Sequence, residues 1–320
     1  MNLLDIEHRW NSIIFSGLKQ YTLLRISSDC VPELYLAIDR NGNRFLILEV
    51  PKGLNIKCSD VELQNLSIQW HGETRLIIIG LLNKQFIDLY NDLTLSLYNH
   101  IKGINNPETY TTGFIHTFNK WRNFFNDNDN NELSEAELKG IFGELIILNW
   151  YLENKDDIET DAILDAWQGP YNSSQDFIFS DFNLEVKTKN EEEPNVRISN
   201  EFQLEPEIGK KLEIAIVNVR KINEGTSLEG LITSIKNKII EAGGDLSIFF
   251  KALLKAGVAG KNVDKYINYK WLAQNVSFYN CNDDLFPKII SSGIATGVSR
   301  VKYNLNVSVL APFLIKKIEF

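Results

Sequence analysis

Residues 176–187 read Asp-Phe-Ile-Phe-Ser-Asp-Phe-Asn-Leu-Glu-Val-Lys, and this stretch decides the fold of the second half of the chain. Two short apolar runs are separated by a polar Ser-Asp pair, which is the pattern of a β-hairpin with a two-residue loop. With that loop, Asp176 lies directly opposite Glu185, with Cβ atoms about 5 Å apart, and Lys187 is a diagonal neighbour. The pattern therefore brings two acids and one base together.

The chemistry of this group depends on which way its side chains point. In residues 183–188 the side chains of Glu185 and Lys187 share one face of the strand, because side chains alternate between faces. Two close carboxylates repel each other unless a cation lies between them, and such oxygen ligands suit Mg²⁺ or Mn²⁺. A lysine beside the ion can hold an attacking water and offset charge on a phosphoryl group. A Glu-x-Lys pair is also common as a solvated ion pair worth little, so the pattern alone leaves both interpretations open.

A helix is expected to begin at Ser134, where Ser134 and Glu137 form a capping-box pattern. Its apolar stripe consists of Leu138, Ile141, Phe142, Leu145, Leu148 and Leu152. Glu144 falls within that stripe, where an acid is unfavourable unless it has a partner. Gly140 and Gly143 beside it let another backbone approach, as where a helix carries a carboxylate to the edge of a sheet. The alternative is a glutamate at the border of the apolar face that reaches water.

The pattern along the rest of the chain indicates a mixed α/β fold preceded by a β-rich domain. Apolar runs at 21–26, 33–39, 44–50, 61–70 and 74–82 predict a small antiparallel sheet, with an Asn-Gly-Asn turn at 41–43. Helical periodicity is expected at 86–101, 114–125, 228–242 and 246–256, and strands at 212–219, 276–279 and 301–310. Ser199 or Asn200 can cap a further helix that carries Gln203. We place a β-rich domain at 1–105, a helical connection at 106–133 and a third segment at 134–320.

Composition limits the class of protein. With 44% hydrophobic and 23% charged residues over 320 positions, the chain is typical of a globular protein. Its longest dense apolar run, 76–82, is too short to span a bilayer, and the N-terminus lacks a signal-peptide pattern, so we expect a cytoplasmic protein with no membrane contact. Cys30, Cys58 and Cys281 are odd in number and far apart, which indicates neither a disulfide framework nor a zinc site. No Gly-rich phosphate loop supports nucleotide hydrolysis.

Charge is unevenly distributed. The net charge is −9, but residues 201–320 carry 16 Lys and Arg against 12 Asp and Glu, a net +4 that leaves −13 for residues 1–200. Affinity for phosphate comes largely from lysine and arginine, so a nucleic-acid contact is expected in the C-terminal part. The densest basic stretch is interleaved with aromatic residues and can track a phosphate backbone; its lysines are Lys251, Lys255, Lys261, Lys265 and Lys270. Lysines on the outer face of a helix are more often only solvated, so this interpretation stays open.

The order of these elements, a Glu on a helix, then an Asp, then Glu-x-Lys, resembles the PD-(D/E)XK phosphodiesterase superfamily with its restriction-endonuclease-like fold. More narrowly, the chain is similar to a bacterial family of PD-(D/E)XK proteins often associated with restriction and phage-defence genes. The similarity rests on Gly140-Ile141-Phe142-Gly143-Glu144-Leu145, Trp167-Gln168-Gly169-Pro170, Asp176-Phe177, Glu185-Val186-Lys187-Thr188 and Ile198-Ser199 with Gln203-Leu204. It implies a mixed central sheet flanked by helices, in a nuclease-like domain at 134–320 with a C-terminal extension.

The resemblance also implies a role for each matching residue. The ligands of a Mg²⁺ or Mn²⁺ ion would be Asp176, Glu185 and the main-chain carbonyl of Val186, completed or modulated by Glu144. Lys187 would orient the water and stabilise the transition state. Gln203 is a lesser catalytic candidate, placed to contact the water or the scissile strand. The chain departs from the family pattern at Gln175, which stands where a proline usually precedes the aspartate.

The leading hypothesis is therefore a Mg²⁺-dependent DNA endonuclease of a bacterial restriction-modification or phage-defence system, working with methyltransferase or ATPase subunits. A homodimer is expected by analogy, since double-strand cleavage by a single-site nuclease usually calls for two protomers. The alternative is a non-catalytic, nuclease-like subunit that binds DNA or a partner, which the acidic charge balance and the β-rich segment favour. A ribonuclease would share the site, but no RNA-binding motif supports it.

Overall fold

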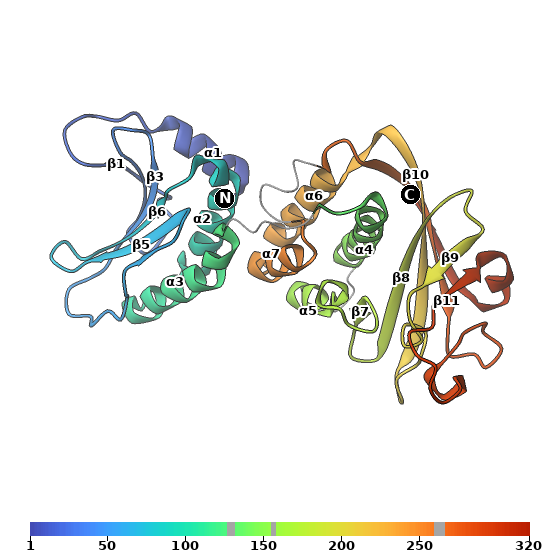
Figure 1. Cartoon of the computed structure of the whole chain (residues 1–320). Coiled ribbons are helices and arrows are strands. Elements are labelled where there is room, and N and C mark those ends of the chain that lie inside the picture. The colour runs from blue at the N-terminus through green and yellow to red at the C-terminus, as the bar shows by residue number, and fades with distance from the viewer. Residues whose placement is uncertain (127–131, 155–157, 259–265) are drawn as a thin grey trace. The chain divides into compact units, whose positions relative to one another are not determined.

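The computed structural model describes residues 1–126, 132–154, 158–258 and 266–320. The chain divides into two compact units, one formed by residues 1–129 with 245–250 and the other by residues 130–244 with 251–320 (Figure 1). The predicted division at residues 105 and 133 stays a prediction; the segment after residue 105 forms helix α3 (Pro107–Trp121), which groups with the first unit. No helix in the described ranges combines the length and the apolar character needed to cross a membrane.

The first unit contains an antiparallel sheet of six strands in the order β1-β2-β3-β6-β5-β4. Its strands are β1 (Thr22–Arg25), β2 (Leu34–Ile38), β3 (Arg44–Glu49), β4 (Val61–Glu62), β5 (Leu66–His71) and β6 (Leu76–Leu81). The apolar runs that predict strands all lie in this sheet, with the run at 61–70 divided between β4 and β5. At the β2–β3 turn the Asp39 carboxylate accepts the N–H groups of Asn41 and Asn43 at 2.8 and 2.9 Å, and Gly42 adopts φ +70°. The predicted turn is confirmed.

Helices of the first unit lie along one face of this sheet (Figure 1). They are α1 (Leu3–Ser12), α2 (Ile87–Ile101) and α3, with the 3₁₀ turns η1 (Lys84–Phe86) and η2 (Arg122–Phe125). The Tyr90 hydroxyl of α2 donates to the Ile79 carbonyl at 2.8 Å, which ties α2 to β6. Helix α1 begins with a capping box formed by Asn2 and Asp5. Helix α1 is not predicted from the sequence, because its ten residues show only a short apolar stripe.

A mixed sheet of five strands forms the centre of the second unit, in the order β13-β11-β10-β8-β7. Its strands are β7 (Phe177–Ile178), β8 (Phe182–Asn190), β10 (Lys211–Ser227), β11 (Lys270–Asn280) and β13 (Leu314–Glu319). Strands β8 and β10 run parallel, whereas the other neighbouring pairs are antiparallel. The prediction of a mixed α/β fold with a mixed central sheet flanked by helices is confirmed. Strand β10 continues eight residues beyond its predicted end at residue 219.

Different elements cover the two faces of this sheet (Figure 1). On one face α4 (Glu135–Glu153) packs against β8, and α6 (Leu228–Glu241) packs against β10 and α4. The other face carries a two-stranded ribbon of β9 (Asn195–Ile198) and β12 (Tyr303–Asn306), whose apolar side chains join the core formed by Leu212, Ile214 and Ile216 of β10. The remaining elements of this part of the chain are α5 (Thr160–Ala166), α7 (Leu246–Lys255), η3 (Gly169–Tyr171), η6 (Ser291–Gly293) and η7 (Val307–Phe313).

Two predicted elements near the ribbon differ from the structure. The strand expected at 301–310 is β12 followed by the 3₁₀ helix η7. The helix expected after Ser199 is wrong, because residues 201–204 form a turn. Asn200 does act as a cap there, since its side-chain oxygen accepts the N–H groups of Phe202 and Gln203 at 2.9 and 3.1 Å. A capping signal alone does not distinguish a single turn from a helix.

The close approach of α4 to β8 depends on Gly143. A Cβ atom at this position would lie 1.8 Å from Thr188 Oγ1, so no larger residue fits without a shift of helix or strand. At Gly140, one helical turn earlier, a Cβ would meet nothing within 4 Å. The predicted capping box is present, with Glu137 N–H donating to Ser134 Oγ and Ser134 N–H to Glu137 Oε2. Together these features fix the position of Glu144, the residue after the contact.

Candidate active site

The hairpin of β7 and β8 has the predicted register. It pairs Phe177 with Leu184 and Ile178 with Asn183. A hydrogen bond of 2.9 Å from Phe179 N–H to the Phe182 carbonyl leaves only two residues in the loop. One step further along this register, Asp176 lies opposite Glu185, as the sequence predicts.

Asp176 directly precedes the two-residue strand β7, and hydrogen bonds hold both its main chain and its side chain. Its carbonyl accepts the N–H groups of Gln168 and Gly169 at 2.7 and 3.0 Å. Its Oδ2 accepts the N–H of Val186 at 2.7 Å, so the carboxylate replaces a main-chain partner beyond the end of β7. Since the N–H and C=O of one strand residue point to the same side, the Val186 carbonyl is directed past β7 as well.

Glu144 reaches the same place from α4. Trp167 donates its indole N–H to Glu144 Oε2 at 2.8 Å. A Cβ atom at Gly169 would lie 2.5 Å from Glu144 Oε2 and 2.9 Å from Asp176 Oδ1, so both carboxylates pack against this glycine. The sequence analysis gives Trp167 and Gly169 no role, and their only signal is their place in a motif of the resemblance. The structure shows that they bring the Glu144 and Asp176 carboxylates together.

Glu185 and Lys187 form a buried ion pair rather than a solvated one. Lys187 Nζ lies 2.6 Å from Glu185 Oε1, and the two side chains are 15% and 1% exposed. Glu185 Oε2 is buried and accepts no hydrogen bond from the described part of the chain. Lys187 Nζ also donates to Gln203 Oε1 at 3.2 Å. Because both side chains are largely buried, this pair differs from the common solvent-exposed Glu-x-Lys pair.

Gln203 and Gln175 connect the site to the turn after β9. Gln203 Oε1 accepts the Ser199 N–H at 2.7 Å in addition to Lys187, so its orientation is fixed from two directions. Gln175 is 4% exposed, and its side-chain N–H donates to the Phe202 carbonyl at 2.9 Å. The residue that stands in place of the usual proline therefore joins the hairpin to the turn that carries Gln203. The sequence shows that Gln175 departs from the family pattern, but this contact with a distant turn has no signal in the sequence.

Burial raises the pKa of each acid in this cluster, and repulsion by neighbouring carboxylates adds to it for Glu144 and Glu185. Burial, followed by the charge of Asp176, raises the pKa of Glu144 well above its usual value, and the same two causes raise that of Glu185 to about 8. Burial also raises the pKa of Asp176, although Lys187 and the Val186 N–H oppose it. For Lys187, burial lowers the pKa, but the attraction of Glu185 and Asp176 outweighs it and the pKa is raised. The single positive charge of Lys187 does not neutralise three carboxylates when all of them are ionised.

The donor set fits a divalent cation held by two carboxylates and a main-chain oxygen. Asp176 Oδ1 is not the oxygen bonded to Val186, Glu185 Oε2 is buried without a donor, and the Val186 carbonyl points past β7. Across the described ranges no group of three or more His, Cys, Asp or Glu side chains is arranged to hold a metal. The Lys187 ammonium lies at Glu185 Oε1, so Oε2 is the Glu185 oxygen that remains for an ion.

The described lysines of the predicted basic stretch are not part of this cluster. Lys251 and Lys255 are exposed on α7, and Lys251 Nζ lies 5.8 Å from the centre of the Tyr171 ring. Lys270 is partly buried at the first position of β11. Lys261 and Lys265 lie outside the described residues. The assignment of these lysines to DNA binding stays a prediction.

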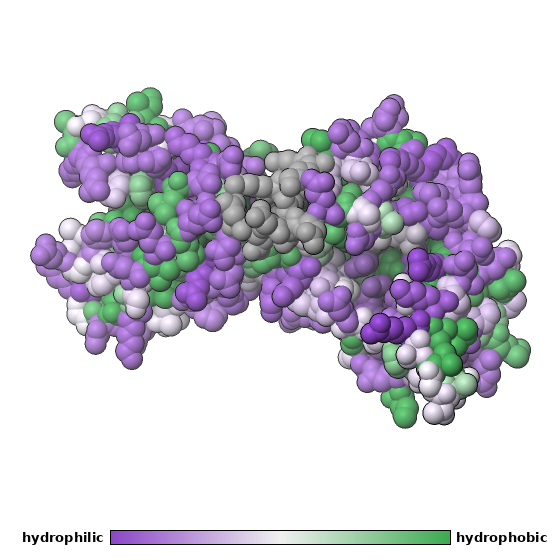
Figure 2. Space-filling view, in the orientation of Figure 1, coloured by the Kyte–Doolittle hydropathy of each residue, from purple (hydrophilic) through white to green (hydrophobic). Residues whose placement is uncertain are grey.

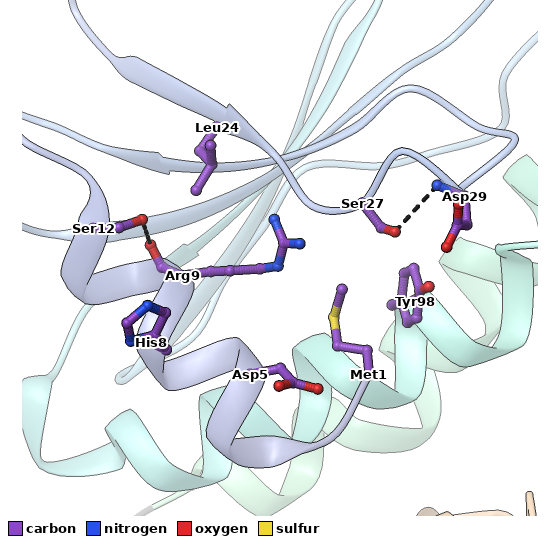
Figure 3. A pocket seen from close by; sticks show the side chains of 9 residues that line it. All are labelled: Met1, Asp5, His8, Arg9, Ser12, Leu24, Ser27, Asp29 and Tyr98. Carbon is purple, nitrogen blue, oxygen red and sulfur yellow. Dashed lines mark hydrogen bonds between the residues drawn. The ribbon is translucent and has the colours of Figure 1, made fainter.

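A polar cavity of about 530 Å³ lies in the first unit (Figure 3). Asp5, His8 and Arg9 of α1 and Tyr98 of α2 line it, together with Ser27 and other residues. The Ser27 hydroxyl accepts the Asp29 N–H at 3.1 Å beside it. Arg9 and Asp5 give the cavity charges of both signs. It belongs to a different unit from the acidic cluster and contains none of the predicted site residues.

Comparison with known protein families gives one match. The model of a family described as "Putative PD-(D/E)XK family member, (DUF4420)" matches residues 6–308. No curated protein and no solved structure matches the chain. The matched range extends well beyond residues 134–220, where the resemblance of the motifs is specific, and it includes residues of both compact units.

Proposed function

The chain belongs to this PD-(D/E)XK-related, nuclease-like family, and on that premise we propose that it hydrolyses phosphodiester bonds of DNA with Mg²⁺ or Mn²⁺. The observation that carries the proposal is the convergence of Glu144, Asp176, Glu185 and Lys187 from a helix and a hairpin. A buried excess of carboxylate charge beside a held lysine is what a cation-dependent phosphoryl site needs.

The roles follow from the contacts. Asp176, Glu185 and the Val186 carbonyl would hold the ion, with Glu144 beside Asp176 adding negative charge. When bound, the ion supplies Lewis-acid stabilisation of the charge that grows on the phosphoryl oxygens. Lys187 Nζ, fixed between Glu185 and Gln203, stays protonated and can donate to the attacking water or to a phosphoryl oxygen. Water attacks phosphorus in line, and the bond to the 3′-oxygen breaks as the new P–O bond forms; the water's proton passes to a deprotonated carboxylate of the cluster and the 3′-oxygen takes up a proton from solvent.

The test is cleavage of DNA by the purified full chain. Supercoiled and linear DNA are incubated with Mg²⁺ or Mn²⁺, alone and with proteins encoded by neighbouring genes. Lys187→Ala should lower the cleavage rate by a factor on the order of 10³, because an electrostatic stabiliser of the transition state is removed. Lys211→Ala, at an exposed lysine at the start of β10, is the matched control and should cut as the wild type does. Absence of cleavage of every DNA form, or equal cleavage by Lys187→Ala, contradicts the proposal.

A non-catalytic, nuclease-like subunit is the second candidate. The short ion pair between Lys187 and Glu185 favours it, because the ammonium already neutralises one oxygen of the site. Calorimetric titration with Mn²⁺ separates the two candidates. A catalytic site binds the ion and loses it in Asp176→Asn, which keeps an acceptor for the Val186 N–H but removes the charge. Heat changes that are the same in both proteins favour the non-catalytic subunit.

We extend the proposal to a cellular setting on the strength of the resemblance alone. The DNA would be foreign, the partners methyltransferase or ATPase subunits, and a homodimer would supply one site for each strand. Phage plating on cells that carry the gene with and without its neighbours tests the setting. Sedimentation of the chain with and without DNA tests the dimer. No protection by any gene combination, or a monomer on cleaved duplex DNA, contradicts the respective part.

A further inference from the structure

The ribbon of β9 and β12 has one face without any acidic residue. Arg197 pairs with Asn304 and Asn195 with Asn306. If the register is continued one residue beyond the last pair, Ser199 lies opposite Lys302. All six residues are exposed. The alternate positions, Val196, Ile198 and Leu305, are buried in the core against the central sheet. This outward face is made only of Arg, Lys, Asn and Ser side chains, so no carboxylate on it repels an anion.

This ribbon lies on the same face of the central sheet as the catalytic side chains. Glu185 is in register with Ile214 and Lys187 with Ile216 across the parallel pair, and residues in register share a face. Ile214 and Ile216 belong to the core cluster that contains the ribbon's buried residues. The last outward residue of β9 is also bonded to the site, because the Ser199 N–H donates to Gln203 Oε1, which accepts from Lys187.

A third cation is held at the same end of the ribbon. Arg300 has φ +58°, a left-handed conformation that is uncommon for a residue with a side chain. The Glu201 carboxylate, in a residue that is 6% exposed, accepts the N–H groups of Arg300 and Val301 at 3.2 and 3.0 Å. A buried carboxylate thus maintains a strained main chain and leaves the Arg300 side chain exposed.

Arg197, Arg300 and Lys302 form no ion pair with any residue in the described ranges. Some other basic residues of this unit are paired: Lys139 with Glu193, Arg220 with Glu191 and Lys221 with Glu135. The acidic residues 191–193 precede Asn195, at the opposite end of β9 from Ser199. Three positive side chains without an ion-pair partner in the described ranges therefore lie at the end of the ribbon next to the site. Figure 2 shows strongly hydrophilic side chains around the position of β9.

We propose that this outward face, with Arg197, Arg300 and Lys302, binds the sugar–phosphate backbone of double-stranded DNA beside the phosphate that is cut. The proposal rests on the proposed function and names the surface that holds its substrate. Arg, Lys, Asn and Ser side chains are the groups that contact DNA phosphates in proteins. A two-stranded ribbon also fits the width of a DNA groove. These residues are a different set from the lysine stretch at 251–270, for which the sequence leaves DNA binding open.

The experiment measures binding of the full chain to a labelled duplex by fluorescence anisotropy, in EDTA and at increasing KCl. Arg197→Gln/Lys302→Gln should weaken binding at low salt and make the slope of log K against log[KCl] shallower by about 2, one for each lost phosphate contact. Lys19→Gln/Lys52→Gln, at exposed lysines of the first unit, removes the same charge and should leave the slope unchanged. Thermal melts confirm that the variants fold.

Other outcomes overturn the proposal. A ribbon variant that binds with the wild-type slope shows that the surface does not contact DNA, and the proposed function survives if the wild type still cleaves. A slope that changes in Lys251→Gln/Lys255→Gln instead assigns binding to the lysine stretch. If the wild type neither binds nor cleaves DNA, the proposed function and this surface fail together.

Discussion

Replacement of Gly143 by alanine tests the contact that positions Glu144. The added Cβ would lie 1.8 Å from Thr188 Oγ1, and rotation of the threonine does not solve the problem, since its Cβ and Cγ2 lie 3.0 and 3.2 Å away. Overpacking of this kind costs about 1–3 kcal/mol. Alanine also gains about 1 kcal/mol in helix propensity over glycine. The two effects oppose each other, so the free energy of unfolding of Gly143→Ala alone does not measure the overpacking.

Gly140→Ala is the matched control, because it changes the propensity in the same helix and meets nothing within 4 Å. The difference between the two alanine variants cancels the propensity and isolates the overpacking. We expect Gly143→Ala to be less stable than Gly140→Ala by about 1–3 kcal/mol. Guanidinium unfolding followed by circular dichroism, with tryptophan fluorescence as a second probe, measures it. Equal stabilities within about 0.5 kcal/mol would refute the close approach of α4 to β8.

A second variant identifies the partner. Thr188→Ala removes both Oγ1 and Cγ2, so Gly143→Ala should be tolerated better in that background, with a coupling free energy on the order of 1 kcal/mol. Strict additivity would mean that the strain lies elsewhere. Because Glu144 follows Gly143 directly, a displaced α4 also separates Glu144 from Asp176, and DNA cleavage should fall together with stability.

Two further outcomes are expected. Trp167→Phe removes the N–H that donates to Glu144 Oε2, so cleavage should fall about 10- to 100-fold with an unchanged circular dichroism spectrum; unchanged cleavage would mean that Glu144 needs no orientation by Trp167. Asp39 has a lowered pKa, since the N–H groups and side chain of Asn43 and the N–H of Asn41 outweigh burial. Its contribution, about 1 kcal/mol, is present above pH 4 and is lost as the pH falls through the lowered pKa of the folded state. The stabilities of wild type and Asp39→Asn should therefore converge from pH 6 to pH 3, and a constant difference would contradict this.

Local features of the site are predictable from sequence. The hairpin register follows from a two-residue loop and alternating side chains, both of which are set within residues 176–187. The capping box of α4 and the need for a glycine near Glu144 are also local, although only the structure distinguishes Gly143 from Gly140. The faces of β8 are as expected, with Lys187 toward Gln203 and Thr188 against α4.

Contacts between distant segments are not predictable in this way. Trp167 and Gly169 acquire their roles only when α4 and the hairpin meet, so nothing in residues 167–170 alone indicates them. Gln203 is reached through a turn rather than a helix, because the cap at Asn200 is followed by no apolar stripe that a helix could bury. The burial of the Glu185–Lys187 pair likewise depends on the turn after β9, which covers it from a separate part of the chain.

Asp176 has consequences for how this protein can be inactivated. One oxygen of its carboxylate is engaged by the Val186 amide at 2.7 Å, so the side chain is oriented before any ion arrives and little rotational freedom is lost on binding. Truncation to alanine would leave that amide without an acceptor, at a cost of about 1–3 kcal/mol. A loss of activity could then come either from a disturbed hairpin or from the missing carboxylate. Asparagine preserves the acceptor, so Asp176→Asn is the substitution that tests the proposed activity in an intact protein.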